Sequence, residues 1–424
     1  MPGQTDDEQL AGYLDPVVSA GLRDWHNSGR GFPVRTPSAR WKPDGGYTAA
    51  ILVPLIVITP GGERQVLLKV CPPGDSEVRS HDAAWSSGGS FAREHLVPSA
   101  YPPWPLEDGR HLTFQEFAGD MHPDCRPLST FGPNTLAHVA PGLARSLFVD
   151  WNEARIRTRA YASVRKALQA EAGQDTGSVL RWTAPISPAD TRWIILDEQV
   201  MPNPVSLMAG HWPNADRRVD VLVGHTHGDL HLQNILVTMD EDTESLKTFW
   251  LIDLATYSAD ASLTSDPVRL ILSVVAQQLG ALDDRHHQKL LNAVMKPWEV
   301  HSREQPQALV TSVYRTLETA VLQARSGWSG EYRKQYHLSI LAQALTFTTF
   351  ERLGRHRWWF FRLAALAARQ FTGEPEKQGS VPHVENPFPS VGGTPSVMEE
   401  AVSTEKNGLD VPTSGLIVPD DFFD

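Results

Sequence analysis

The sequence of 424 residues has few cysteines and no long apolar run, and both absences exclude kinds of protein. Its two cysteines, Cys71 and Cys125, are too few for a disulfide-rich secreted fold and do not form a zinc-binding spacing. The longest apolar run, residues 49–58, contains Pro54 and is much shorter than a membrane span. We therefore expect a chain that has no membrane partner.

Positive charge is scarce too. Lysine and arginine number 38 against 50 aspartate and glutamate residues, which gives a formal net charge of −12. This balance predicts no basic groove for nucleic acid, so a phosphate site would depend on local positive charge. The N-terminal stretch MPGQTDDEQL is acidic and polar, unlike a secretory signal. We expect a cytoplasmic protein that binds no nucleic acid.

The most informative segment is VGHTHGDLHLQNILV, in which polar residues separate two apolar stretches. Within it, His227, Asp229 and Asn234 are spaced as H-x-D-x-x-x-x-N, and the next apolar strand ends on Asp253. Strand ends would bring these two carboxylates and one amide together. Phosphoryl transfer uses such groups, because a carboxylate orients and deprotonates a hydroxyl while oxygen ligands hold Mg²⁺ against the phosphates.

A zinc site is the alternative for the same segment. His225, His227, Asp229 and His231 read H-x-H-x-D-x-H, close to the H-x-H-x-D-H of metallo-β-lactamase-like zinc hydrolases. In that motif the aspartate and the last histidine are adjacent, whereas Leu230 separates them here. Zinc binding would also leave the downstream amide and acidic strand end unexplained, so we favour phosphoryl transfer.

The chain upstream offers parts of a nucleotide-binding lobe. Gly45 and Gly46 predict a turn before an apolar strand, where backbone N–H groups can approach a phosphate, although Gly-Gly is often only a turn. Lys69 lies near the end of the short strand predicted over 64–70. Its ammonium would point at the phosphates of a nucleotide. A lysine on an edge strand that faces solvent is the alternative.

A helix predicted over residues 75–85 places Glu77 where it could pair with Lys69. Glu94 is the second candidate for this pairing. An exposed carboxylate in the first turn of a helix is the alternative role for Glu77, because it is favourable there in its own right.

The strand predicted over 112–117 ends at a turn and would join two lobes. Backbone groups of Glu116 and Ala118 would then bind the edge of an adenine. An ordinary sheet strand that ends in a turn would have the same sequence pattern.

These parts follow one another over residues 41–271, and in this order the chain resembles the aminoglycoside phosphotransferase/choline kinase superfamily. The HGDLHLQN string is more similar to this branch than to protein kinases because glycine takes its second place. The opening GGYTAA, the LKV strand and the predicted helix at Trp151 and Asn152 are most similar to phosphotransferase-like ternary complex associated domains of bacterial conflict and signalling systems.

The resemblance implies an α+β, two-lobed protein-kinase-like fold with a small antiparallel-sheet N-lobe and a mostly helical C-lobe. We expect an N-terminal helical extension (1–40), an N-lobe (41–120) and a C-lobe (121–371) that includes a long helix over 143–172. The remaining tail, 372–424, is rich in Pro, Gly, Ser, Thr and Glu, which predicts disorder. The end of this tail is a candidate binding motif for a protein partner.

The resemblance further implies an ATP- or GTP-dependent phosphotransferase. Asp229 would orient the acceptor hydroxyl and accept its proton, while Asn234 and Asp253 would bind Mg²⁺. Lys69 would hold the phosphates and Glu77 would hold Lys69. The acceptor, a small-molecule or protein hydroxyl, is not readable from the sequence. A nucleotide-binding pseudoenzyme that serves as an assembly module is the alternative.

Two further expectations concern the C-lobe. Asp266 is predicted to cap the helix that follows it, and the resemblance also gives an aspartate near this position the role of anchoring the catalytic-loop backbone. Residues 173–222, which include Trp182 and Trp193, form an insertion that could shape an acceptor pocket. Core packing is the commoner role for a single tryptophan.

Overall fold

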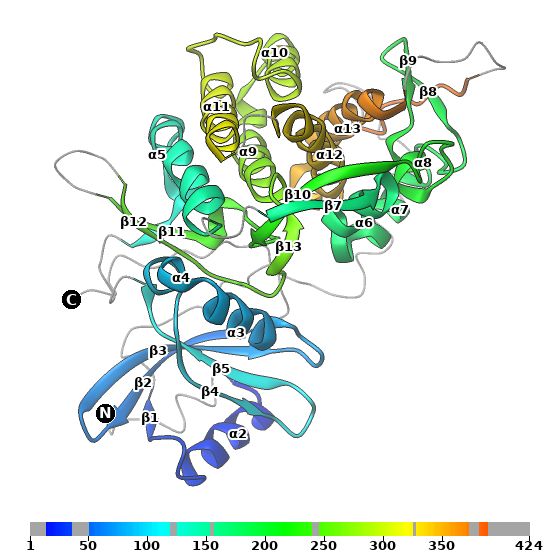
Figure 1. Cartoon of the computed structure of the whole chain (residues 1–424). Coiled ribbons are helices and arrows are strands. Elements are labelled where there is room, and N and C mark those ends of the chain that lie inside the picture. The colour runs from blue at the N-terminus through cyan, green and yellow to red at the C-terminus, as the bar shows by residue number, and fades with distance from the viewer. Residues whose placement is uncertain are drawn as a thin grey trace.

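The structure is a computed structural model of the whole chain. It describes residues 14–35, 51–118, 125–152, 157–239, 246–324, 328–372 and 381–388. These residues form a small lobe built on a five-stranded sheet and a larger, mostly helical lobe (Figure 1). The arrangement confirms the predicted two-lobed α+β fold. No helix in the described part of the chain is long and apolar enough to cross a membrane.

The small lobe contains one sheet with the strand order β1-β2-β3-β5-β4, in which all neighbouring strands are antiparallel. Its elements are α2 (Pro16–Asn27), β1 (Val34–Arg35), β2 (Ile51–Thr59), β3 (Gly62–Cys71), α3 (Glu77–Ser87), α4 (Gly89–His95), β4 (Ser99–Pro105) and β5 (His111–Gln115).

The two faces of this sheet differ because side chains alternate along β3. Val66, Leu68 and Val70 are buried in a core shared with Leu22 and Trp25 of α2, which covers this face. The residues between them, among which is the strand lysine, belong to the opposite face, beside α3 and the large lobe (Figure 1). One face of the sheet is therefore an apolar core, and the other can carry chemistry.

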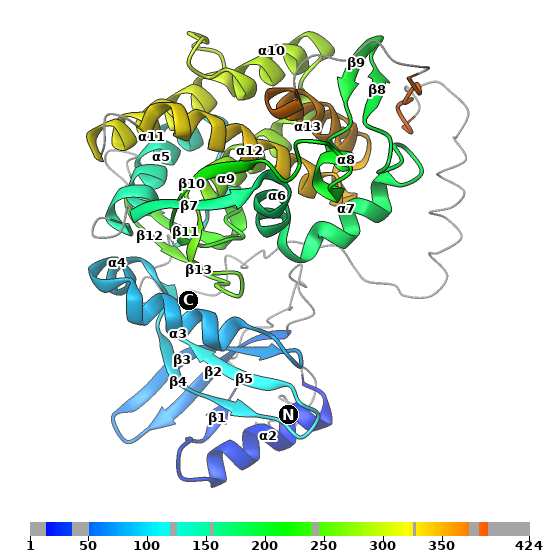
Figure 2. The same cartoon turned by 45° about the vertical axis from the view of Figure 1, so that its right-hand side comes forward.

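Helices α3 and α4 lie between the sheet and the large lobe (Figures 1 and 2). Leu96, which follows α4, forms a bridge with Leu251 of the large lobe. The ring of His95 stacks on Phe249 with 4.0 Å between centroids, and its Nδ1 lies 3.0 Å from the carbonyl oxygen of that residue. The two lobes are therefore joined by packing as well as by the chain.

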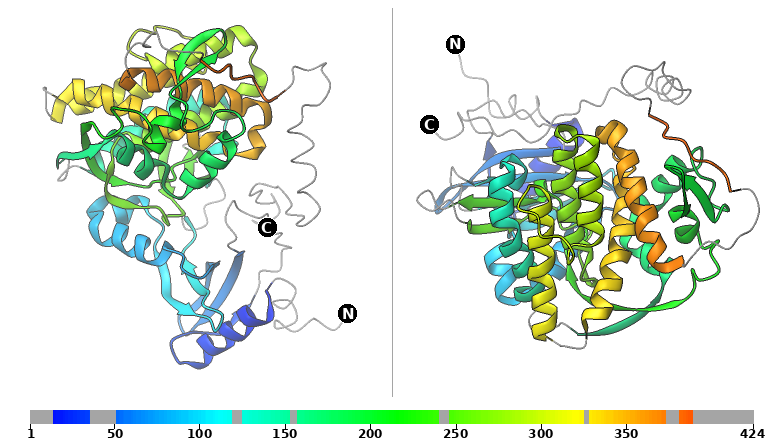
Figure 3. Two further views of the ribbon diagram at one scale, coloured as in Figure 1. Left: turned by 90° about the vertical axis from the view of Figure 1, so that its right-hand side faces the viewer. Right: turned by 90° about the horizontal axis from the view of Figure 1, so that it is seen from above.

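The large lobe packs its helices around α12 (Ser329–Phe347), in which residues 335–347 are all buried. Figure 3 shows the helices of this lobe from above. Its other helices are α5 (Pro133–Arg145), α6 (Val164–Ala172), α7 (Thr176–Thr183), α8 (Pro204–Ala209), α9 (Ser265–Gln278), α10 (Asp284–Met295), α11 (Gln307–Ala324) and α13 (Arg357–Thr372).

Short strands complete the large lobe and form three small sheets with the orders β13-β10-β7, β12-β11-β6 and β8-β9. They are β6 (Arg126–Pro127), β7 (Arg157–Ser163), β8 (Trp193–Leu196), β9 (Gln199–Pro202), β10 (Arg218–Thr226), β11 (Ile235–Met239), β12 (Leu246–Leu251) and β13 (Ser258–Ser262).

The helix predicted over 143–172 is wrong in its middle. Helix α5 ends at Arg145 and is followed by a π-helical turn over Ser146–Asp150. Strand β7 then comes before α6. The backbone of β7 pairs with β10, where Ala160 is opposite Val221. Pairing with a strand that is distant in the sequence overrides the local helical preference of this segment.

The expected disorder of 372–424 is wrong for residues 381–388. Ile195 of β8 donates its N–H to the carbonyl of Pro382 at 2.8 Å, and Val384 donates to the carbonyl of Ile195 at 2.9 Å. Val384 is also buried. This segment is ordered because it pairs alongside β8 and buries an apolar side chain. Residues 389–424, which include the candidate binding motif, lie outside the described residues.

Candidate active site

The backbone that follows β10 is fixed by Asp266. Its Oδ2 accepts the N–H of His227 at 2.6 Å, and its Oδ1 accepts the N–H of Gly228 at 2.9 Å. Gly228 has φ of +82°, and a Cβ there would overlap the carbonyl oxygen of Thr256, so the position requires glycine. The predicted anchoring role of Asp266 is present. Its predicted role as N-cap is wrong, because Asp266 is the second residue of α9 and Thr264 occupies the N-cap position, without a capping side-chain bond.

The ring of His227 is held on both sides within the loop. One nitrogen, Nε2, lies 2.8 Å from the carbonyl oxygen of Ile252, and the other, Nδ1, accepts the N–H of Asp229 at 3.3 Å. These partners assign the proton to Nε2. Nδ1 of His225 lies 2.6 Å from the hydroxyl of Tyr257.

The zinc alternative is wrong for this loop. Among the described residues, no group of three or more His, Cys, Asp or Glu side chains could hold a metal ion. The ring nitrogens of His227 are also taken by the backbone bonds described above, which leaves no lone pair for zinc.

Asp229 is half-buried, and its two oxygens have different surroundings. Oδ1 is buried and ion-paired with Arg269, whose side chain is only 8% exposed. Oδ2 lies 3.8 Å from Nε2 of His231. Burial lowers the pKa of His231, against the effect of the Asp229 carboxylate. Since 31% of the Asp229 side chain is exposed while Oδ1 is not, Oδ2 is the oxygen that an incoming group can reach.

Arg269 is not among the site residues predicted from the sequence. A signal was present, since this arginine interrupts the apolar start of α9 three residues after Asp266 and therefore lies on the same helix face.

Asn234 and Asp253 lie at the neighbouring ends of β11 and β12. Ile235 pairs with Leu251, and the N–H of Ile252 donates to the carbonyl of Asn234 at 3.1 Å. Nδ2 of Asn234 donates to the carbonyl of Asp229 at 2.9 Å, which turns its amide within the loop and leaves Oδ1 as a ligand oxygen. The hairpin thus brings the predicted metal ligands side by side.

Lys69 meets both Glu77 and Asp253. Its Nζ lies 3.1 Å from Oε2 of Glu77 and 3.0 Å from Oδ1 of Asp253. Glu77 is the first residue of α3, and its N–H donates to Oδ1 of Asp75 at 2.6 Å. The predicted pairing of Lys69 with Glu77 is present, whereas Glu94 is exposed and is not its partner.

Charge decides the ionisation of this cluster. Burial disfavours the ammonium of Lys69, but the carboxylates of Glu77 and Asp253 outweigh it and raise the lysine pKa. Burial raises the pKa of Glu77, which Lys69 opposes. Burial also opposes ionisation of Asp253, yet Lys69 brings its pKa below the ordinary value. The ammonium of Lys69 and the carboxylate of Asp253 therefore favour each other's charged form.

Two serines tie α3 to the loop that follows Asp253. The hydroxyl of Ser76 donates to the carbonyl of Ala255 at 2.6 Å, and that of Ser80 donates to the same oxygen at 3.1 Å. The glutamate of α3 and the carboxylate at the end of β12 are thereby held together across the two lobes.

The remaining predicted contacts belong to the small lobe. The N–H of Glu116 donates to the carbonyl of Pro98 at 3.0 Å, and its carboxylate is ion-paired with Arg64. The carbonyl of Glu116 and the N–H of Ala118 are then the backbone groups that we expect to contact an adenine edge. These contacts stay a prediction. Gly45 and Gly46 lie outside the described residues.

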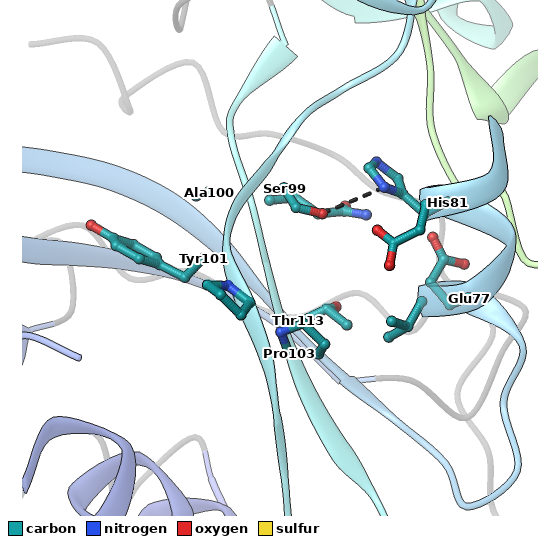
Figure 4. A pocket seen from close by; sticks show the side chains of 11 residues that line it. Glu77, His81, Ser99, Ala100, Tyr101, Pro103 and Thr113 are labelled. Carbon is teal, nitrogen blue, oxygen red and sulfur yellow. Dashed lines mark hydrogen bonds between the residues drawn. The ribbon is translucent and has the colours of Figure 1, made fainter. Parts of the chain in front are cut away.

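A hollow of about 370 Å³ adjoins the Glu77 side of this cluster. Figure 4 shows Glu77 and His81 on α3 facing Ser99 of β4 and Thr113 of β5, while the ring of Tyr101 points away from α3. Thr113 is directly opposite Lys69 in the sheet, so this hollow opens on the same face as the lysine. It extends the site behind the ion pair.

No protein-family model matches the chain, and no curated protein matches it either. Among solved structures, it is similar to a thermostable mutant of aminoglycoside phosphotransferase APH(4)-Ia, a ternary complex with ADP and hygromycin B. The identity is 12%, the TM-score is 0.44, and the match covers 84% of this chain and 100% of that one. At such a low identity and TM-score, this likeness carries no argument about function.

Two other solved structures are of the same kind. A Plasmodium vivax ethanolamine kinase is 10% identical with a TM-score of 0.36, and the match covers 87% of this chain and 95% of that chain. A type VIII aminoglycoside-3'-phosphotransferase is 16% identical with a TM-score of 0.35, over 71% of this chain and 100% of that chain.

Proposed function

We propose that the protein is a phosphotransferase that moves the γ-phosphate of ATP or GTP to a hydroxyl of an acceptor. The observation that carries this proposal is the meeting of Lys69, Glu77 and Asp253, which come from a strand, a helix start and a strand end far apart in the sequence. A lysine held between two carboxylates beside a catalytic-loop motif is the arrangement that phosphoryl transfer in a kinase-like fold requires.

Lys69 would bind the nucleotide phosphates. Its raised pKa keeps the ammonium charged, and Glu77 holds it in place from the base of α3. Strand β2 begins at the sheet end where Lys69 lies, since Leu52 pairs with Lys69. This placement supports the proposal that Gly45 and Gly46, just before β2, bind phosphate through their backbone.

The donor set fits magnesium. Mg²⁺ prefers oxygen ligands and is commonly held by one or two protein groups, with water and substrate phosphates filling its other positions. Asn234 offers its Oδ1 and Asp253 its carboxylate, and hairpin pairing keeps the two residues adjacent. When bound there, the ion would neutralise charge that develops on the transferred phosphoryl group.

Asp229 would orient the acceptor hydroxyl and take its proton. Oδ2 is the reachable oxygen, and the loop backbone that carries it is fixed by Asp266 and by the glycine at 228. As the hydroxyl oxygen attacks the γ-phosphorus, its proton passes to Oδ2 and the bond to the nucleoside diphosphate breaks. Positioning contributes more than basicity in such a reaction.

The acceptor is a small-molecule or protein hydroxyl. In the described insertion, Trp193 packs edge-on against Trp212 with 5.0 Å between ring centroids, and Trp182 contacts Phe361. These contacts support core packing for the two tryptophans more than a role in an acceptor pocket. The placement among ternary complex associated domains stays a prediction, and no observation favours the pseudoenzyme.

Thermal-shift titration with Mg-ATP and Mg-GTP, followed by a phosphate-transfer screen over alcohols, amino alcohols and protein substrates, tests the proposal. We expect stabilisation that requires both Mg²⁺ and nucleotide, and transfer to at least one hydroxyl class. Lys69→Met should reduce the shift strongly, while Lys247→Met, at an exposed strand lysine, should keep it. Binding without transfer to any acceptor would contradict the proposed activity and favour an assembly module.

A further inference from the structure

Arg269 has no assigned role, yet it lies against the proposed catalytic aspartate. It projects from the first turns of α9, where its neighbours Val268 and Leu270 are buried in the large core. An arginine in such a position gives up most of its hydration. One nitrogen, Nη2, is ion-paired with Oδ1 of Asp229.

The guanidinium is also held from behind. Its other terminal nitrogen, Nη1, donates to Oε1 of Gln343 at 3.1 Å. Gln343 is fully buried on α12, and its Nε2 donates to the hydroxyl of Ser265 at 3.0 Å. The same Nε2 lies 3.3 Å from the carbonyl of Glu171. Arg269 is therefore held between a fixed amide on one side and the catalytic carboxylate on the other.

Stability alone does not account for this arrangement. A buried ion pair loses in desolvation much of what it gains in attraction, so well-packed apolar residues of similar size often do as well. A planar guanidinium, however, fixes direction, because its two terminal nitrogens point at set angles. The value of this pair lies in the geometry that it gives to Asp229.

We propose that Arg269 is a positioning residue that binds Oδ1 of Asp229 and thereby turns Oδ2 toward the acceptor hydroxyl. This inference rests on the proposed phosphotransferase function for its consequence, although the contact itself does not. The two carboxylate oxygens then have separate tasks: one is held by the protein and one serves the substrate. Lysine cannot replace Arg269 fully, because one ammonium cannot span Gln343 and Asp229 in the same plane.

A double-mutant cycle tests the contact without any need for activity. The free energy of unfolding is measured in urea for the wild type, Arg269→Met, Asp229→Ala and the double variant. We expect the double variant to lose clearly less stability than the two single losses added together, because the second change removes a group that has already lost its partner. Additive losses would overturn the proposal. If Arg269→Met does not fold, Arg269→Gln, which also removes the positive charge, takes its place in the cycle.

Kinetics test the consequence. Arg269→Met should lower kcat by roughly 10²-fold, the scale of a misplaced catalytic group, while KM for nucleotide changes little. Arg269→Lys should recover only part of this loss. Arg357→Met is the matched control: that half-buried arginine lies over the ring of Trp182 and does not contact the site, so kcat should be retained. A raised nucleotide KM with unchanged kcat would overturn the positioning role.

Chemical rescue gives a third readout. In Arg269→Ala, guanidinium ion added at non-denaturing concentration should raise kcat severalfold, because it can occupy the vacated space between Gln343 and Asp229. Sodium chloride at the same ionic strength should not, and equal rescue by both would overturn the proposal. A wild type that transfers no phosphate would contradict the proposed function, and the double-mutant cycle would then decide whether Arg269 holds Asp229.

Discussion

The site contains two buried cations, and the protein holds them in different ways. Lys69 and Glu77 belong to the small lobe and Asp253 to the large one, so this cluster spans both lobes and sets one cation against two carboxylates. Arg269 meets one carboxylate, Asp229, and an uncharged amide, all within the large lobe. The first cluster has one more negative than positive charge and therefore attracts a cation. In the second cluster the charges of Arg269 and Asp229 cancel, so we expect it to stay in place.

This difference predicts which of the two clusters would change its contacts when ligands bind. A metal ion held by Asp253 would compete with Lys69 for the same carboxylate, so binding of nucleotide and metal would rearrange the first cluster. Nothing comparable competes for the buried oxygen of Asp229. We therefore expect the lysine cluster to respond to ligands and the arginine cluster to stay fixed.

Asp253→Ala should have the largest effect, because it removes both a proposed metal ligand and one of the contacts between the lobes. We expect Mg²⁺-dependent nucleotide affinity to fall by more than the roughly 10–100-fold that loss of an outer-shell group costs. Isothermal titration calorimetry with and without Mg²⁺ measures this. Asp260→Ala, at an exposed position of β13, is the control and should bind normally. An unchanged Mg²⁺ dependence in a folded Asp253→Ala protein would refute the metal assignment.

Asp229→Asn breaks the balanced cluster instead. The rate of phosphate transfer should fall by roughly 10²-fold or more, the scale of a positioned acid–base group, while nucleotide affinity stays nearly intact. The amide keeps an acceptor toward Arg269 but presents N–H donors to the substrate, so the loss falls on chemistry. Single-turnover kinetics beside a binding titration separate the two terms. Equal losses in both would make Asp229 a metal ligand or a structural residue.

Lys69→Met and Glu77→Gln should both weaken nucleotide binding, to different degrees. Lys69→Met should weaken nucleotide binding by roughly 10- to 100-fold, from the 1.5–3 kcal/mol of a hydrogen bond to a charged group. Glu77→Gln should weaken it less, since it loosens Lys69 without removing its charge. A fluorescent nucleotide titration measures both. A Glu77→Gln protein that binds worse than Lys69→Met would show that Glu77 has a role beyond holding the lysine.

Glu171→Gln tests a third buried carboxyl. Unlike Asp253 and Asp229, Glu171 is bonded to hydroxyl groups and not to a cation. Burial raises the pKa of Glu171 to about 7, against the hydroxyls of Ser262, Ser339 and Ser265. The folded protein then holds this proton more tightly than the unfolded chain. The free energy of unfolding should therefore fall as pH rises from the ordinary value of 4.5 to about 7, by on the order of 3 kcal/mol.

Urea unfolding near pH 5 and near pH 8 measures most of this dependence. The difference between the two pH values should shrink in Glu171→Gln, because glutamine does not titrate. Glu299→Gln, at an exposed position, should leave it unchanged. An equal pH dependence in Glu171→Gln and the wild type would show that Glu171 does not carry it.

The residues that were predictable from sequence are those whose position follows from strand ends and fixed spacing. Asp229 and Asn234 share one loop, and Asp253 ends a strand, so an apolar pattern with polar ends places them together. The prediction for Lys69 and Glu77 also assumes that a short strand and the next helix face the same cleft. The order of the motifs along the chain supports this assumption.

What was missed depends on pairing between distant segments. Arg269 meets Asp229 only because α9 packs beneath the loop, and its anchor Gln343 lies 74 residues further along the chain. Strand β7 forms because it pairs with β10, and the local sequence pattern does not predict this pairing. The N-cap assigned to Asp266 failed because its carboxylate is used by the loop instead of by its own helix.

The contact of residues 381–388 with β8 has a practical consequence for solution behaviour. Strands β8 and β9 form only a two-stranded sheet, and such a ribbon has backbone groups free to pair with another chain. By bonding to Ile195 and placing His383 beside it, the returning chain covers the outer side of β8. A protein shortened at Thr372 would uncover that side. It should therefore self-associate on storage even where its melting temperature is unchanged.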